Sequence, residues 1–167
     1  MAETELRKYA VIEKLNKMEV DLIKSSPDIA EATYSTGDLM AEGEIIDNIV
    51  AVNGGTCILQ SITAIDTSDT GGTIYVVLTD ITADLGTVGS AINAADSAAD
   101  NSMAIVELSN WTDVGGAKVC CKSNIGIVLK ADTNYRYLKY GIVNASGGDI
   151  VIGSGEDIIF QFGVVKD

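Results

Sequence analysis

The start of the chain carries a helical pattern of apolar positions. Residues 3–24 contain no Gly or Pro and are rich in Glu, Lys, Leu and Met, which favour helices. Pro27 follows shortly afterwards and disfavours a helical residue before it. The pattern predicts one N-terminal α-helix. Its apolar side chains recur at steps of four, three and four on one face, namely Val11, Leu15, Met18 and Leu22.

This apolar stripe has two alternative packing partners. It packs either on the chain's own domain or on copies of itself or a partner, as in a short coiled coil. A helix of this length is only marginally stable alone in water, so some packing surface is required. We take the four stripe residues as candidates for a contact between copies or with a partner.

From residue 44 onward the pattern is that of a β protein. Short runs rich in Val, Ile, Thr and Tyr alternate with turn sequences such as NGG, DTSDTGG and ASGGD. Because no helical pattern lies between the runs, we expect an antiparallel β-sandwich, jelly-roll or Greek-key-like. The expected strands are residues 44–52, 56–66, 73–80, 103–108, 117–122, 126–131, 134–143, 149–152 and 157–165.

These patterns predict three parts in the chain. Residues 1–26 form a helical arm, residues 27–43 an extended connector, and residues 44–167 the β-sandwich domain. The runs 56–66 and 134–143 carry apolar groups on both faces, so a helix or a neighbouring subunit should cover part of the outer face. Residues 80–102 lack strand character, and we expect an exposed insertion and candidate contact loop there.

Charge excludes several partners. The net charge of the 167 residues is −13, and residues 25–117 hold fourteen Asp and Glu but no Lys or Arg. Nucleic-acid affinity depends on cationic side chains, so we expect no direct binding of DNA or RNA.

We also expect no membrane association, because no apolar run approaches the roughly 18–20 residues that span a bilayer, and the N-terminus lacks the apolar region of a signal peptide.

Most of the usual catalytic groups are missing. The chain contains no His, so neither a Ser-His-Asp nor a Cys-His arrangement can form. The nucleophile elbow GxSxG and the phosphate-binding GxxxxGK[ST] are also absent. We therefore expect neither an enzyme nor a bound cofactor.

Two further groups of residues bear on metal binding. Cys57, Cys120 and Cys121 lack CxxC spacing, and adjacent residues on a strand point to opposite faces, so we expect free thiols and no metal. The loop DTSDTGG offers Asp66 and Asp69 as oxygen ligands for Ca²⁺. We favour a β-hairpin loop in which these acids bond nearby backbone amides.

Several stretches resemble a known class of proteins. GGTCILQSITAIDTSDTGG, NWTDVGGAKVCC, YRYLKYGIVNASGGD and the closing EDIIFQFGVVKD are similar to accessory virion proteins of tailed bacteriophages, the decoration or cement proteins and their head-fibre relatives. The resemblance covers residues 44–167 and lies in fold-pattern residues. It implies a β-sandwich, often trimeric, on the outer capsid.

The resemblance implies a decoration protein that binds the major capsid protein and stabilises the shell across subunit seams. Its place would be the capsid exterior after synthesis in the host cytoplasm, as a homo-oligomer with a trimer favoured. The alternative is a tail, baseplate or head-fibre component that binds a receptor or glycan through residues 80–102 or aromatics such as Trp111 and Tyr140. A cellular carbohydrate-binding module or adhesin is a third, non-viral possibility.

Overall fold

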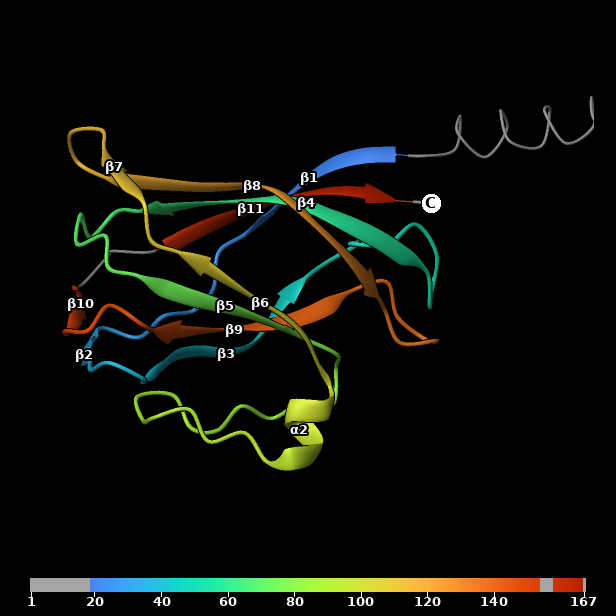
Figure 1. Cartoon of the computed structure of the whole chain (residues 1–167), viewed down its shortest axis with the longest axis horizontal. Helices are drawn as coiled ribbons and strands as arrows, with labels where there is room; N and C mark the ends of the chain where they lie inside the picture. The colour runs from blue at the N-terminus through green and yellow to red at the C-terminus, as the bar shows by residue number, and fades with distance from the viewer. Residues whose placement is uncertain (1–18, 154–157, 167) are drawn as a thin grey trace, which may run out of the picture.

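The computed structural model of the chain describes residues 19–153 and 158–166, and the described part is mostly β-strand (Figure 1). Its one helix, α2 (Asp96–Asp100), is short, and it is not long and apolar enough to span a membrane. The strands are β1 (Glu19–Ser25), β2 (Ala32–Tyr34), β3 (Leu39–Ile46), β4 (Thr56–Asp66), β5 (Ile74–Thr79), β6 (Ser102–Leu108), β7 (Trp111–Asp113), β8 (Lys118–Lys130), β9 (Leu138–Asn144), β10 (Ile150–Ile152) and β11 (Ile158–Lys166).

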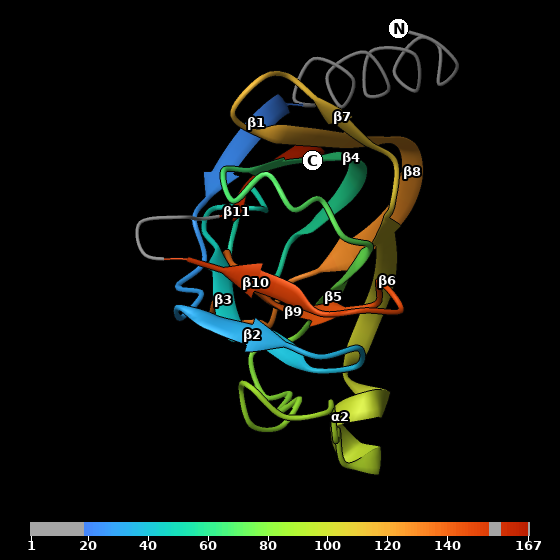
Figure 2. The ribbon, with the colours of Figure 1, turned by 90° about the vertical axis from the view of Figure 1, so that its left-hand side faces the viewer.

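The strands form two main sheets that face each other. One has five strands in the order β1-β11-β4-β8-β7, and the other has four in the order β3-β9-β5-β6. Every pair of neighbouring strands in the described residues is antiparallel, which confirms the predicted mainly β, antiparallel class. The small β10-β2 ribbon crosses one end of the molecule (Figure 2).

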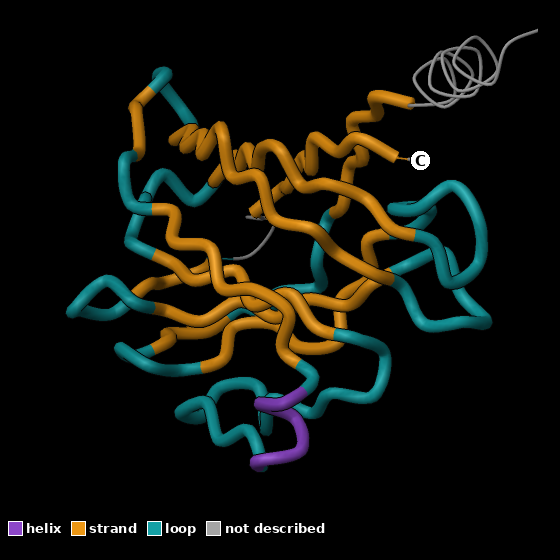
Figure 3. Tube along the Cα trace, turned by 45° about the vertical axis from the view of Figure 1, so that its right-hand side comes forward, coloured by secondary structure: helices purple, strands orange, loops and turns teal. Residues whose placement is uncertain are grey.

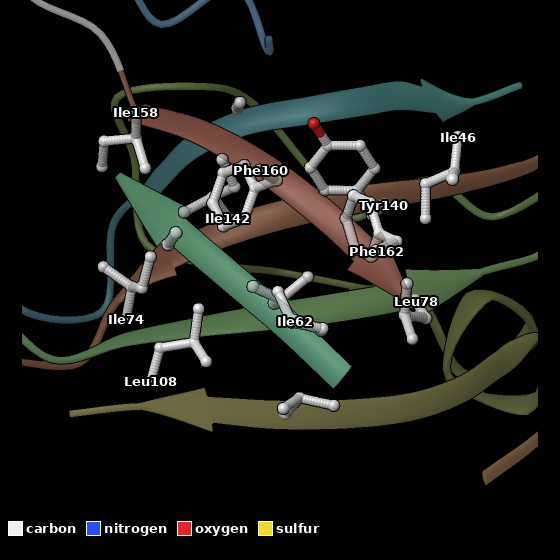
Figure 4. Packing of buried hydrophobic residues seen from close by; sticks show 14 of the residues in the cluster. Ile46, Ile62, Ile74, Leu78, Leu108, Tyr140, Ile142, Ile158, Phe160 and Phe162 are labelled. Atoms are coloured by element: carbon white, nitrogen blue, oxygen red, sulfur yellow. The ribbon is translucent and has the colours of Figure 1, made fainter. Parts of the chain in front are cut away.

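Aromatic side chains join the two sheets in the core. Tyr140 on β9 packs edge-on against Phe160 and Phe162 on β11, with ring centroids 5.7 and 5.4 Å apart (Figure 4). The Tyr140 hydroxyl lies 2.8 Å from the Ser25 hydroxyl on β1. Burial raises the pKa of Tyr140 above its usual value. Strict alternation on β11 places Ile158, Phe160, Phe162 and Val164 in the core.

The predicted N-terminal helix does not extend to residue 24. Residues 1–18, with Val11, Leu15 and Met18, lie outside the described residues, but residues 19–24 belong to β1 and pair with β11 from Glu19–Lys166 to Ser25–Phe160. The cross-strand partner decides the conformation here, because a ladder with β11 outweighs the modest helix propensity of these residues. Residues 19–25, which were assigned to the arm, therefore belong to the five-stranded sheet.

Residues 27–43 are also more than a connector. They contain β2 and the first part of β3. The buried Asn144 side chain donates a 2.7 Å hydrogen bond to the Tyr34 carbonyl, which ties β2 to the end of β9. These contacts come from residues more than a hundred positions away, so no local pattern predicts them.

Two expected strands are one strand in the structure. Residues 118–122 and 126–130, which make up most of the two expected strands, belong to β8, which runs along β4. The residues between them contain an irregularity, where Asn124 and Gly126 have positive φ values of 57° and 69°. The register with β4 shifts between Leu59 and Ser61. A bulge of this kind bends a strand without ending it.

Residues 80–102 cover the outer face of the four-stranded sheet rather than standing free of it (Figure 3). Leu85 is 2% exposed and packs with Leu39, Val77 and Val143. The Leu39 backbone exchanges hydrogen bonds with this loop, receiving one from Gly89 N–H at 2.8 Å and donating one to the Ser90 carbonyl at 2.9 Å. Around Val77 and Val143 the outer face is covered, by the chain's own loop and not by the expected helix or neighbouring subunit.

Candidate interaction surface

The DTSDTGG loop is built around the Asp66 carboxylate, which is 2% exposed. Ser68 N–H donates to its Oδ1 at 2.8 Å and Gly71 N–H to its Oδ2 at 2.7 Å. Asp69 and Gly71 have φ values of 58° and 63°, in the left-handed region that Asp and Gly tolerate in turns. The predicted role of Asp66 as a binder of nearby backbone amides is confirmed.

The same loop is not a hairpin. β4 belongs to the five-stranded sheet and β5 to the four-stranded sheet, so the loop carries the chain across the sandwich. Among the described residues, no three His, Cys, Asp or Glu side chains gather where they could hold a metal ion. The loop therefore acts as a structural arch whose acidic residue closes the turn.

Neither aromatic candidate stands free on the surface. Tyr140 is fully buried between the sheets, so its proposed role in an exposed glycan or receptor site is wrong. Trp111 on β7 is half-buried and packs against the core. Its Nε1 is buried without a hydrogen-bond partner in the part of the chain that the structure describes.

The cysteines lie as the strand alternation predicts. Cys120 is buried and Cys121 exposed on β8, and Cys57 is buried on β4. Burial raises the pKa of the Cys120 thiol. None of the three forms a disulfide, and the two adjacent ones face opposite sides of the sheet.

The outward face of the five-stranded sheet carries an apolar row that crosses four strands. Cross-strand pairing joins Val20 to Val165, Val165 to Ile58, and Ile58 to Val128. We call these four residues the apolar row. Val20 is 81% and Val128 67% exposed, while the two central members are half-buried. A solvated antiparallel face is normally polar, so this row is a candidate contact surface.

Leu22 is the one predicted contact residue that the structure describes. It follows Val20 on the outward face of β1 and is 61% exposed. Its neighbours across the sheet are Gly163 and then Ser61, so the face turns polar beyond the apolar row. Leu22 is thus placed at the surface, on a strand beside the row and not on the predicted helix.

The edge of the sheet beside this face is partly blocked. Lys166 Nζ donates a 2.7 Å hydrogen bond to Asp21 Oδ2, and the hydrogen bond from this ammonium lowers the pKa of Asp21. The other Asp21 oxygen accepts the Leu22 N–H at 2.8 Å. Because that N–H is already bonded, a strand from another molecule cannot use it without displacing Asp21.

Sequence reasoning did not single out the apolar row. Its members come from four strands, and each is an ordinary apolar residue of a β-rich sequence. The available signal was the two-sided apolarity of residues 56–66, where Ile58 and Leu59 point to opposite faces. The row itself requires the register between β1, β11, β4 and β8.

Comparisons with known proteins give little further guidance. No protein-family model matches the chain, and no curated protein matches it. Among solved structures, a chain from the capsid of Ralstonia phage GP4 is similar at 16% identity, with a TM-score of 0.41 over 90% of this chain and 85% of that chain. This is a loose likeness in shape.

Proposed function

We propose that the chain is a structural protein of a phage virion, and specifically a non-enzymatic decoration protein that binds the outer surface of the capsid. Its partner is then the major capsid protein, and its place is the capsid exterior. The sequence resemblance of residues 44–167 to accessory virion proteins is one support for this proposal.

The strand order is the structural observation that supports the proposal. One sheet contains the strands β1-β11-β4-β8, and the facing sheet contains β3-β9-β5-β6. This strand order corresponds to that of an eight-stranded jelly roll, to which β7 and the β10-β2 ribbon are additions. Jelly rolls recur in viral capsid and lectin domains. A fold alone does not assign a function, so the viral choice between these two rests on the sequence resemblance.

A decoration protein works by differential affinity. A ligand that binds the assembled shell better than the free subunits stabilises the shell. A homotrimer, which we favour, would attach at several neighbouring sites at once and so turn modest contacts into firm attachment. No covalent chemistry and no cofactor are needed for this activity.

Capsids that lack this protein provide the test. We expect purified full-length protein to bind them at a regular, saturable stoichiometry, to appear as density on the exterior by electron microscopy, and to raise their melting temperature. Free capsid protein should bind much more weakly. Absence of exterior density at saturating protein would contradict the proposal.

A second candidate is a receptor-binding or glycan-binding component of a tail or fibre. Tyr135 and Tyr137, just before β9, lie with their rings 4.9 Å apart, and Tyr135 is 36% exposed. Exposed aromatic rings are common platforms for sugar faces. Specific binding on a glycan array that is lost in Tyr135→Ala, but kept in the similarly exposed Tyr75→Ala, would favour this function.

A further inference from the structure

We propose that two copies of the chain associate through the open edge of β6 and form one continuous antiparallel sheet across a two-fold axis. This inference concerns the free protein and does not depend on the proposed virion role. A two-fold axis pairs each β6 edge with that of one other copy. In a homotrimer, the same contact would therefore join two trimers.

β6 is the last strand of the four-stranded sheet, and only β5 pairs with it (Figure 2). Residues 104–108 pair with β5 in regular register, and the one register shift lies before them, beside Ser102. An edge strand turns a row of backbone N–H and C=O groups away from its sheet. In the described part of the chain no other strand pairs with this edge of β6, so a further strand can add to it.

The three other edges of the two main sheets carry features that hinder pairing. On β1 the Asp21 carboxylate accepts the Leu22 N–H, and β7 has only three residues. β3 has two register shifts with β9 and holds Glu42 and Glu44. β6 contains neither Lys nor Pro, and its one charged residue is Glu107. The edge of β6 is therefore the one that most readily accepts another strand.

Charge and apolar exposure select one register for the paired strands. Ile105, at the centre of β6, is 62% exposed. Antiparallel pairing about this residue sets Ile105 opposite Ile105 and Ala104 opposite Val106, whereas Glu107 lies opposite Met103. The two Glu107 side chains are then separated by four residues along the strands, about 13 Å at 3.3 Å per residue. Like charges directly opposite each other are destabilising, so a register centred on Glu107 is disfavoured.

A second copy suits this edge better than an extended peptide does. Its β6 is already a strand, whereas a peptide loses conformational entropy with every residue that it orders. Antiparallel pairing also places the two acidic α2 helices, with Asp96 and Asp100, at opposite ends of the paired strands. Each copy has a net charge of −13, and salt screens the remaining repulsion between them. Salt should therefore strengthen the association.

Single-cysteine variants test the register in the full-length chain. In a Cys121→Ser background, Ile105→Cys should form a disulfide-linked dimer on mild oxidation, because directly opposed strand residues have Cα atoms about 4.5–5.5 Å apart, within the range of a disulfide. Glu107→Cys, also exposed on β6, is the control and should cross-link far less on its own, but should cross-link with Met103→Cys in a mixture. Equal cross-linking of Ile105→Cys and Glu107→Cys, each on its own, overturns the proposal.

Sedimentation equilibrium gives an independent readout. The wild-type chain should associate in even-numbered steps, more strongly at high salt than at low salt. Ile105→Lys should weaken this association at least about tenfold, although the added Lys makes the chain less negative. Val128→Lys, at a position that is 67% exposed on the other sheet, should leave the association unchanged. Association that persists unchanged in Ile105→Lys, or a wild-type chain that stays monomeric at millimolar concentration, overturns the proposal.

Discussion

Gly141 on β9 shows how closely the loop of residues 80–102 fits the four-stranded sheet. A Cβ atom at this position would meet Leu85 Cδ1 at 2.5 Å and the Ala41 carbonyl oxygen at 3.2 Å. Leu85 is buried and the carbonyl belongs to the backbone, so neither can move freely. The absent side chain therefore makes room for the loop that covers this face.

We expect Gly141→Ala to lower the free energy of unfolding by about 1–3 kcal/mol, as overpacking of a core does. Denaturant titration measures the change. Gly148→Ala is the matched control, because nothing lies within 4 Å of a Cβ atom there. In a Leu85→Ala background, Gly141→Ala should lower the free energy of unfolding by less. An equal cost in both backgrounds would mean that Leu85 is not the neighbour that matters.

Asp21 predicts a dependence of stability on acid pH. Its folded-state pKa lies below the usual value of about 3.9 because Lys166 donates a hydrogen bond to it. The ion pair therefore contributes its full stability at pH values above the usual pKa. This contribution is lost as the pH falls through the lower, folded-state pKa. At pH 7, Asp21→Asn should cost no more than about 1 kcal/mol, since the Asp21 side chain is 40% exposed.

Unfolding curves from pH 7 down to pH 2 measure this effect. Wild type and Asp21→Asn should differ at neutral pH and converge at the acid end. Glu107→Gln, on the exposed side of β6, serves as the control and should show no such convergence. A difference that stays constant with pH would contradict the assigned ion pair.

At the scale of the element, the arch between β4 and β5 depends on one carboxylate. Asp66→Ala would leave the Ser68 and Gly71 N–H groups without their partner. Part-buried donors left unbonded cost about 1–3 kcal/mol. We therefore expect Asp66→Ala to lower the free energy of unfolding by about 2–3 kcal/mol, measured by denaturant titration.

Asp69→Asn is the control for the arch, because Asn also tolerates the positive φ of this exposed position. It should change stability by no more than about 0.5 kcal/mol. The same two variants also test whether the loop binds Ca²⁺. A large rise in melting temperature on adding Ca²⁺, abolished by either substitution, would show that the loop binds the cation as well as turning the chain.

At the scale of the whole molecule, the aromatic cluster makes the two sheets one cooperative unit. Phe160 contacts Tyr140 from the opposite sheet and stacks with Phe162 at 6.0 Å. Phe160→Ala should lower the free energy of unfolding by about 3–5 kcal/mol. Fluorescence of Trp111, the single Trp of the chain, and far-ultraviolet circular dichroism should report the same transition.

Val114→Ala provides the comparison for Phe160→Ala, because Val114 is 62% exposed and should change stability by no more than about 0.5 kcal/mol. Two separate transitions in wild type, one for each probe, would show that the sheets unfold independently. That result would contradict the role given to the aromatic cluster.

Several features of this protein follow from its sequence alone. Residues 56–66 were predicted as a strand with the bounds that β4 has, and β5, β6 and β11 lie within two residues of their predicted limits. Alternation of apolar and polar residues and Gly-rich turns are local signals, and antiparallel strands need little else. The role of Asp66 was also local, because its partners lie within five residues.

The tertiary structure decided the features that depend on distant partners. Residues 19–24 form a strand because β11 pairs with them, and the arch after β4 crosses between sheets because β4 and β5 have different neighbours. Tyr140 is buried because Phe160 and Phe162 lie opposite it. The apolar row likewise exists only once four strands are aligned, since pairing register is a long-range property that no single stretch of sequence specifies.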